Sequence, residues 1–218
     1  ALFDRKRIES LDDLAKEEFK LAGIKLNPVN FSRSRARTKF NALTLKHIET
    51  GSVIEVTNIP SGIMRSPQWS SDSQYLAFVL EQANQANLWV YNTQTKQARQ
   101  LSDVALNSVL TSRPYTWLPD STAIVANTAV NIAKQRLTTD TQNVVPVIQQ
   151  STGEKAPART YQNLLTSPFD EQQFKFYGQG QLTYIPLSGI ARAIGKPALF
   201  KSFSVSPDST NLLVGSID

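Results

Sequence analysis

The chain has 218 residues, of which 40% are hydrophobic and 19% are charged, a balance typical of globular proteins that excludes an intrinsically disordered chain. It contains no cysteine, which excludes disulfides, thiol catalysis and cysteine-type zinc sites, and no apolar run approaches the roughly 20 residues that span a bilayer. The net charge of +5 is concentrated in a basic strip between Glu18 and Glu49, where no acid stands among Lys20, Lys25, Arg33, Arg35, Arg37, Lys39 and Lys46.

Residues 1–38 are predicted to form an N-terminal extension. Ser10 with Asp13 three residues later is a helix-start pattern and predicts a short helix. The apolar residues of "LAGIKLNP" (21–28) then indicate a strand. Next, the segments 41–48 and 53–57 alternate apolar and polar residues on either side of "ETGS", which predicts a hairpin.

From Pro67 the pattern is that of four short antiparallel strands in succession. "PQW", "YLAFVLE", "LWVYNT" and "ARQLS" are separated by short polar turns. Residues 75–80 are almost wholly apolar, which is typical of a strand that is buried on both faces.

The beginning of this pattern recurs twice. "WSSDS" (69–73) returns as "WLPDS" (117–121) and as "VSPDS" (205–209), so that Asp72, Asp120 and Asp208 each precede a serine. The intervals between these aspartates are 48 and 88 residues, and a repeat of roughly 40–50 residues that holds four strands is typical of a β-propeller blade. The longer second interval predicts an insertion at 130–178. Within it, Ser167 as N-cap, Pro168 in the first turn and Gly178 as a stop predict a helix over 168–177.

The fold class that follows is all-β: a partial β-propeller with a short N-terminal helix and a helical insertion in one blade. We expect an incomplete propeller over 39–218, with about three to four blades at about 39–62, 65–103, 113–195 and 199–218. The last blade has only two predicted strands, so we expect the chain to be a piece of a longer protein. Unpaired strand edges favour association, so an oligomer is possible.

The same segments resemble a known family. "LAGIKLNPVNFSRSR", the blade at 67–103, "LNSVLTSRPYTWLPDST" and "KAPARTYQNLLTSPFDEQQFKFYGQGQL" resemble the N-terminal propeller of prolyl-oligopeptidase-family serine peptidases, with the closest match to the glutamyl-endopeptidase-like branch. The resemblance implies a propeller that restricts access and helps to bind a peptide substrate for a C-terminal α/β-hydrolase domain. It favours a periplasmic or secreted parent protein, although the sequence leaves the compartment unknown.

No catalytic residue is predicted on this chain. The G-x-S-x-G nucleophile elbow is absent, since Ser188 is followed by Gly189 but has no glycine two residues before it. His47 is the only histidine and is interpreted as a residue at a strand end. We therefore expect no catalytic site, no metal site and no cofactor.

Two interpretations of the basic strip stay open. Arg33, Arg35 and Arg37 form either a solvated edge or a site in which one arginine receives an acidic substrate side chain through bidentate hydrogen bonds. Binding to nucleic acid is disfavoured because no aromatic residues are interleaved with the cations. Trp69, Trp89 and Trp117 are interpreted as residues that pack one blade on the next.

Two functions are compatible with these observations. The first is a peptidase propeller that gates and recognises peptide substrate for a hydrolase domain absent from this chain. The second is a non-enzymatic propeller that scaffolds protein partners. Neither involves nucleic acid or a membrane.

Overall fold

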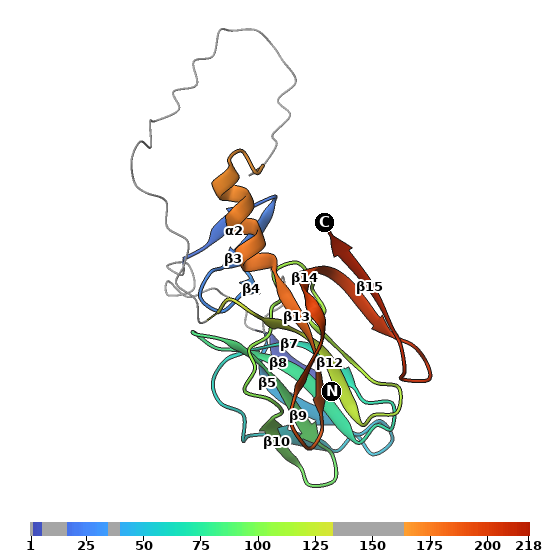
Figure 1. Ribbon diagram of the computed structural model, residues 1–218. Helices are drawn as coiled ribbons and strands as arrows, with labels where there is room; N and C mark the ends of the chain where they lie inside the picture. Colours follow the sequence, from blue (N-terminus) through green and yellow to red (C-terminus); the bar gives the residue numbers. More distant parts are fainter. Residues whose placement is uncertain (1, 6–16, 35–39, 133–163) are drawn as a thin grey trace, which may run out of the picture.

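The computed structural model describes residues 2–5, 17–34, 40–132 and 164–218. Three predictions fall outside this range: the helix near Ser10, the positions of Arg35 and Arg37, and the insertion between residues 133 and 163. The described residues form three antiparallel sheets and one helix (Figure 1).

The middle of the molecule is a four-stranded meander of β7 (Ile63–Trp69), β8 (Tyr75–Glu81), β9 (Ala86–Asn92) and β10 (Gln97–Gln100). The register of β8 and β9 is fixed by the turn at 82–85, where the Gln82 N–H donates to the Gln85 carbonyl. Six of the seven residues of β8 are buried, on both faces of the sheet, as the apolar run predicted.

A second meander comprises β11 (Tyr115–Trp117), β12 (Ala123–Ala129), β13 (Gly180–Pro186) and β14 (Arg192–Val205). The first half of β14 pairs with β13, and its second half pairs with β15 (Leu212–Ile217). One continuous strand therefore leads from the outer edge of one meander into the next pair of strands.

The N-terminal strands lie on the other side of the middle meander. β5 (Phe40–Lys46) forms a hairpin with β6 (Val53–Val56) and also pairs with β1 (Leu2–Arg5), while a single pair, Phe40 with Met64, joins it to β7. Leu43 of β5 is fully buried in a core cluster with side chains of β8 and β9. The hairpin therefore covers one face of the middle meander.

The three predicted turns have the same structure. In each, the residue before the turn pairs with the residue seven positions later: Trp69 with Leu76, Trp117 with Ile124, and Val205 with Leu212. The serine after each aspartate has a left-handed backbone, with φ of 60°, 62° and 61° at Ser73, Ser121 and Ser209. In each turn the aspartate side chain accepts a hydrogen bond from the backbone N–H two residues later, at 3.0–3.1 Å.

The two meanders stack face to face over a shared apolar core. Residues from both sheets contribute to it: Ala77, Val79, Leu88, Val90, Tyr115, Trp117, Ile124, Ala126 and Ile185. The indole Nε1 of Trp117 donates to the Gln68 carbonyl at 3.2 Å, and the Tyr115 hydroxyl donates to the Ala77 carbonyl at 2.8 Å. The backbone N–H of Asp72 donates to the Ser121 hydroxyl at 3.1 Å, which ties one turn to the next.

The opposite face of the second meander repeats this packing. Val125 and Leu118 lie against Phe203, Val205 and Leu212 of β14 and β15. Successive antiparallel sheets that stack through equivalent turns define blades, so the chain forms part of a β-propeller. The all-β prediction and the helical insertion are confirmed.

The insertions of two blades meet at one end of the molecule. The first carries a small sheet of β2 (Phe19–Leu21), β3 (Ile24–Asn27) and β4 (Ser32–Arg33), and the second carries helix α2 (Pro168–Gly178), which lies against that sheet (Figure 1). Their shared core is aromatic: the ring of Tyr177 lies 5.3 Å from Phe31 and 5.5 Å from Phe19, measured between centroids. We refer to the small sheet and α2 together as the roof.

Helix α2 begins at the predicted cap. The Ser167 hydroxyl accepts a hydrogen bond from the Asp170 N–H, and the Asp170 carboxylate accepts one from the Ser167 N–H. At the other end, the Asn107 amide donates to the carbonyls of Tyr177 and Gln179 at 2.8 and 2.9 Å. Orphan backbone groups at both ends of α2 are thus satisfied by side chains.

The contact of Trp117 with the middle sheet predicts a stability difference between two equivalent tryptophans. Trp117 is 7% exposed and Trp69 is 43% exposed. Trp117→Phe removes a buried hydrogen bond and should lower the free energy of unfolding by about 1–3 kcal/mol, whereas Trp69→Phe should change it by less than about 0.5 kcal/mol. Urea unfolding of both variants measures the difference, and equal losses would contradict the assigned contact.

The turn aspartates predict a stability change at low pH. The Ser70 hydroxyl and the Gln74 N–H hold the pKa of Asp72 below its ordinary value of 3.8. Because the pKa is lower in the folded state, the ionised carboxylate stabilises the fold above the unfolded-state pKa, and this contribution is lost as the pH falls through the folded-state pKa. As the pH falls from about 5 to about 3, the free energy of unfolding should therefore decrease less in the Asp72→Asn variant than in the unsubstituted chain. The midpoint of urea unfolding measured across this range tests the expectation, with the exposed Glu55→Gln as control.

Candidate functional site

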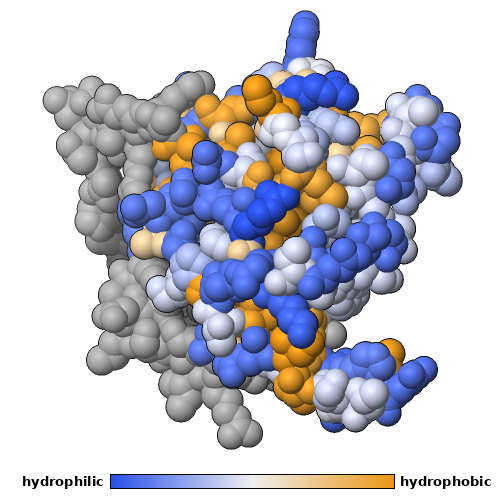
Figure 2. Space-filling model, turned by 90° about the horizontal axis from the view of Figure 1, so that it is seen from below, coloured by the Kyte–Doolittle hydropathy of each residue, from blue (hydrophilic) through white to orange (hydrophobic). Residues whose placement is uncertain are grey.

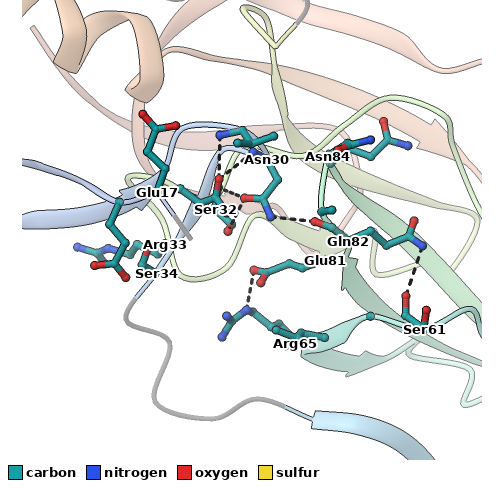
Figure 3. A pocket seen from close by; sticks show the side chains of 17 residues that line it. Glu17, Asn30, Ser32, Arg33, Ser34, Ser61, Arg65, Glu81, Gln82 and Asn84 are labelled. Carbon is teal, nitrogen blue, oxygen red and sulfur yellow. Dashed lines mark hydrogen bonds and ion pairs between the residues drawn. The ribbon is translucent and has the colours of Figure 1, made fainter. Parts of the chain in front are cut away.

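A cleft of about 730 Å³ lies between the roof and the middle blade. Three segments line it: residues 17–34 of the first insertion, residues 61–65 at the start of β7, and the β8–β9 turn (Figure 3). Most of the residues that line it are polar, and they include Asn27, Asn30, Ser32, Ser34, Ser61, Gln82, Asn84 and Gln85.

A buried ion pair lies on the blade side of the cleft. Arg65 of β7 and Glu81 of β8 stand on neighbouring strands, and the Arg65 Nε lies 2.6 Å from a carboxylate oxygen of Glu81. The side chains are only 12% and 6% exposed. The cost of desolvating two buried charges offsets much of their attraction, so this pair adds little net stability to the fold. Its main effect is to fix the position of the two side chains relative to each other.

Asn30 links the roof to the β8–β9 turn of the middle blade. The Asn30 amide donates to the Gln82 carbonyl at 3.0 Å, across the cleft, and its carbonyl oxygen accepts the Ser32 hydroxyl at 2.7 Å. The next residue, Phe31, has a left-handed φ of 54°, a conformation that costs free energy in a bulky residue. This strained backbone directs the Phe31 ring into the aromatic core of the roof, so the roof is held from both sides.

Gly62 allows the cleft wall to approach the blade closely. A Cβ at this position would lie 2.8 Å from the Glu81 carbonyl oxygen and 2.8 Å from Leu80 Cδ1. The absence of a side chain therefore lets the segment before β7 lie directly against the end of β8.

The charges that line the cleft are nearly balanced. Arg33 and Arg65 face Glu17, Glu18 and Glu81, and Glu18 also pairs with Lys25 at 3.3 Å. A cleft with amide donors and acceptors and little net charge can form hydrogen bonds with the main chain of a peptide. Arg33 is the cation in this cleft that could also bind a carboxylate.

The structure places one member of the arginine strip in this cleft. Arg33 lies on β4, half-buried, beside Ser34. Of the turn residues, Asp72, Asp120 and Asp208 occupy equivalent places in the three turns. His47 lies exposed in the β5–β6 turn, where its Nδ1 accepts the Thr50 N–H at 3.2 Å.

Sequence reasoning missed the residues that build the cleft, namely Asn30, Gly62, Arg65, Glu81 and Gln82. The signal in the sequence that pointed to this cleft was Glu81, a charged residue at the end of the otherwise apolar segment 75–81. Among the described residues there is no group of three or more histidine, cysteine or acidic side chains that could hold a metal ion. The helix of the described range is too short and too polar to cross a membrane.

The stacked blades and the roofed cleft define a partial β-propeller with one candidate binding cleft among the described residues. Two curated relatives are similar to this chain over 98% of its length: the probable chloroplastic glutamyl endopeptidases of Arabidopsis thaliana, at 29% identity, and of Oryza sativa subsp. japonica, at 26% identity. The resemblance to the glutamyl-endopeptidase-like branch is thereby confirmed. The chain spans about a quarter of the length of these relatives, 23% and 24%.

Other comparisons are weaker. No family model matches the chain. Among solved structures, TolB from Acinetobacter baumannii has a TM-score of 0.44 at 10% identity, covering 81% of this chain and 34% of TolB. The acylaminoacyl peptidase of Pyrococcus horikoshii has a TM-score of 0.33 at 12% identity, covering 75% of this chain and 30% of that protein.

The close approach at Gly62 predicts a packing defect in a specific variant. Gly62→Ala should lower the free energy of unfolding by about 1–3 kcal/mol, because the added methyl group meets backbone that cannot yield cheaply. The neighbouring Ser61→Ala, at an exposed position, should change it by less than about 0.5 kcal/mol. Urea unfolding measures both, and an unaffected Gly62→Ala variant would contradict the tight contact with Glu81.

Proposed function

We propose that this chain is the N-terminal propeller portion of a serine peptidase, in which it recognises peptide substrate and restricts access to an α/β-hydrolase domain elsewhere in the parent protein. The observation that carries the proposal is similarity over 98% of the chain to two probable glutamyl endopeptidases. The chain itself lacks the nucleophile elbow, so bond cleavage belongs to the rest of the parent protein.

The roofed cleft is the proposed place of recognition. Its walls offer amide and hydroxyl groups for a peptide main chain, and the buried Arg65–Glu81 pair and the Asn30–Gln82 hydrogen bond support a pre-formed shape. A pre-formed groove binds an extended peptide at a lower entropic cost than a mobile one.

Arg33 is the proposed partner of an acidic substrate side chain. It lines the cleft, its guanidinium can form two parallel hydrogen bonds with a carboxylate, and the strip continues with Arg35 and Arg37. Because Glu17 and Glu18 line the same cleft, an acidic ligand must compete with these carboxylates. We therefore expect a modest contribution from Arg33 rather than a dominant one.

The test uses the full-length parent protein and two peptides that differ only in glutamate or glutamine before the scissile bond. Arg33→Ala should lower kcat/KM about tenfold for the glutamate peptide, since a charge-assisted hydrogen bond contributes about 1.5 kcal/mol, and about twofold or less for the glutamine peptide. Arg33→Lys should restore part of the loss.

The matched control is Lys20→Ala, which removes an exposed cation of the same strip that does not line the cleft. Equal losses on both peptides would remove the recognition role of Arg33. Absence of any peptide hydrolysis by the full-length protein would instead favour a non-enzymatic scaffold.

A further inference from the structure

The small sheet of the roof has a free edge along β4. Its strand order is β2–β3–β4, so within the described residues β4 is paired on one side only. Both residues of β4 and the following Ser34 line the cleft, whereas β2 contributes no residue to the lining and β3 contributes only Asn27 at its end. The edge of this sheet that borders the cleft is therefore the unpaired one.

The register of β4 decides which of its main-chain groups face this edge. The Ser34 N–H donates to the Lys25 carbonyl at 3.0 Å, and the next register pair is Arg33 with Leu26. Hydrogen-bonded and non-hydrogen-bonded pairs alternate in an antiparallel ladder, so Arg33 and Leu26 form a non-hydrogen-bonded pair. The N–H and the carbonyl of Arg33 therefore point away from β3, towards the free edge.

The cleft offers room and suitable chemistry for a strand beside this edge. Figure 3 shows Ser32 and Arg33 on its roof side and Arg65 and Gln82 on its blade side, and its volume of about 730 Å³ is typical of ligand sites. The polar residues that line the cleft distinguish it from the face in Figure 2, where apolar side chains lie in patches among hydrophilic ones. Hydrogen bonds are therefore the main interactions that the cleft offers to a ligand.

We propose that the peptide substrate binds as a short extended strand, which adds antiparallel to the free edge of β4; this inference rests on the proposed function. One peptide residue exchanges two main-chain hydrogen bonds with Arg33. Its N–H donates to the Arg33 carbonyl, and its carbonyl accepts from the Arg33 N–H. The side chain of that residue then lies opposite the Arg33 side chain, on the same face of the sheet. The acidic residue of the substrate occupies this position.

This register gives the acidic residue two separate contacts with Arg33. The main-chain pair fixes the distance between the two side chains, so that the carboxylate of the substrate lies within reach of the guanidinium. Glu17 and Glu18 compete with that carboxylate for the cation, but they do not compete for the main-chain groups at the edge of β4. Strand addition therefore holds the peptide in place even where the charge contributes modestly.

Peptide binding to the full-length parent protein tests this register. The probe is fluorescein-labelled Thr-Val-Glu amide, which has no peptide bond after the glutamate, and its affinity is measured by fluorescence anisotropy. N-methylation of the glutamate removes the hydrogen bond to the Arg33 carbonyl and should weaken binding about three- to tenfold, the net contribution of one hydrogen bond. N-methylation of the valine is the matched control. It should weaken binding less than about twofold, because that N–H points away from β4.

A pair of protein variants separates the main chain of residue 33 from its side chain. Arg33→Ala removes the guanidinium and keeps the N–H, whereas Arg33→Pro removes both, and proline is tolerated where the N–H of an edge strand faces outward. Arg33→Pro should bind the peptide at least about threefold more weakly than Arg33→Ala and should keep the near-ultraviolet circular dichroism of the folded protein. Glutamate N-methylation should still weaken binding to Arg33→Ala, but it should have less than about a twofold effect on Arg33→Pro.

Several outcomes would overturn strand addition at β4. They are equal affinities of Arg33→Ala and Arg33→Pro, equal effects of the two N-methyl groups, and no binding of the unmethylated peptide at millimolar concentration. Loss of folded structure in Arg33→Pro would do the same, because the N–H of residue 33 would then be needed within the fold. Failure of the proposed function is a different result, since it appears as equal losses of kcat/KM on the glutamate and glutamine peptides in Arg33→Ala.

Discussion

The structure depends on the burial of the middle blade from both sides. β8 is apolar along almost its whole length, and such a strand is stable only if each face of its sheet is covered by another sheet. The β5–β6 hairpin covers one face and the second meander covers the other. The aspartate turns make this stacking repeatable, because each turn starts a strand pair in the same register, and the first two turns are joined by the hydrogen bond from the Asp72 N–H to the Ser121 hydroxyl.

The cleft is a consequence of where the insertions leave their blades. In the middle blade the second and third strands are joined by the short turn at 82–85, whereas in the two flanking blades the same connection carries an insertion. The insertions therefore meet above the short turn and enclose a space over it. Arg65 and Glu81 lie at that place because β7 begins and β8 ends there.

The local features of this fold could be predicted from the sequence, and the contacts between distant segments could not. The helix at 168–177 follows from Ser167, Pro168 and Asp170, which act within one turn of chain. The strands of the middle blade follow from apolar runs and polar turns. The pairing of Arg65 with Glu81 depends on the strand register, and the meeting of Asn30 with Gln82 joins residues 52 positions apart. Likewise, Trp69 and Trp117 begin equivalent turns, WSSDS and WLPDS, but differ in exposure, because exposure depends on what the neighbouring sheet supplies.

The roof joins the two blades that flank the middle blade. The small sheet of the roof is inserted between strands β1 and β5, which precede the middle blade, and α2 is inserted in the blade that follows it. The rings of Phe31 and Tyr177 pack these two parts together. A wider angle between the two flanking sheets would therefore separate the rings of Phe31 and Tyr177. The width of the groove beneath is therefore coupled mechanically to the spacing of the sheets, so a load applied at either flank would be transmitted to the groove walls.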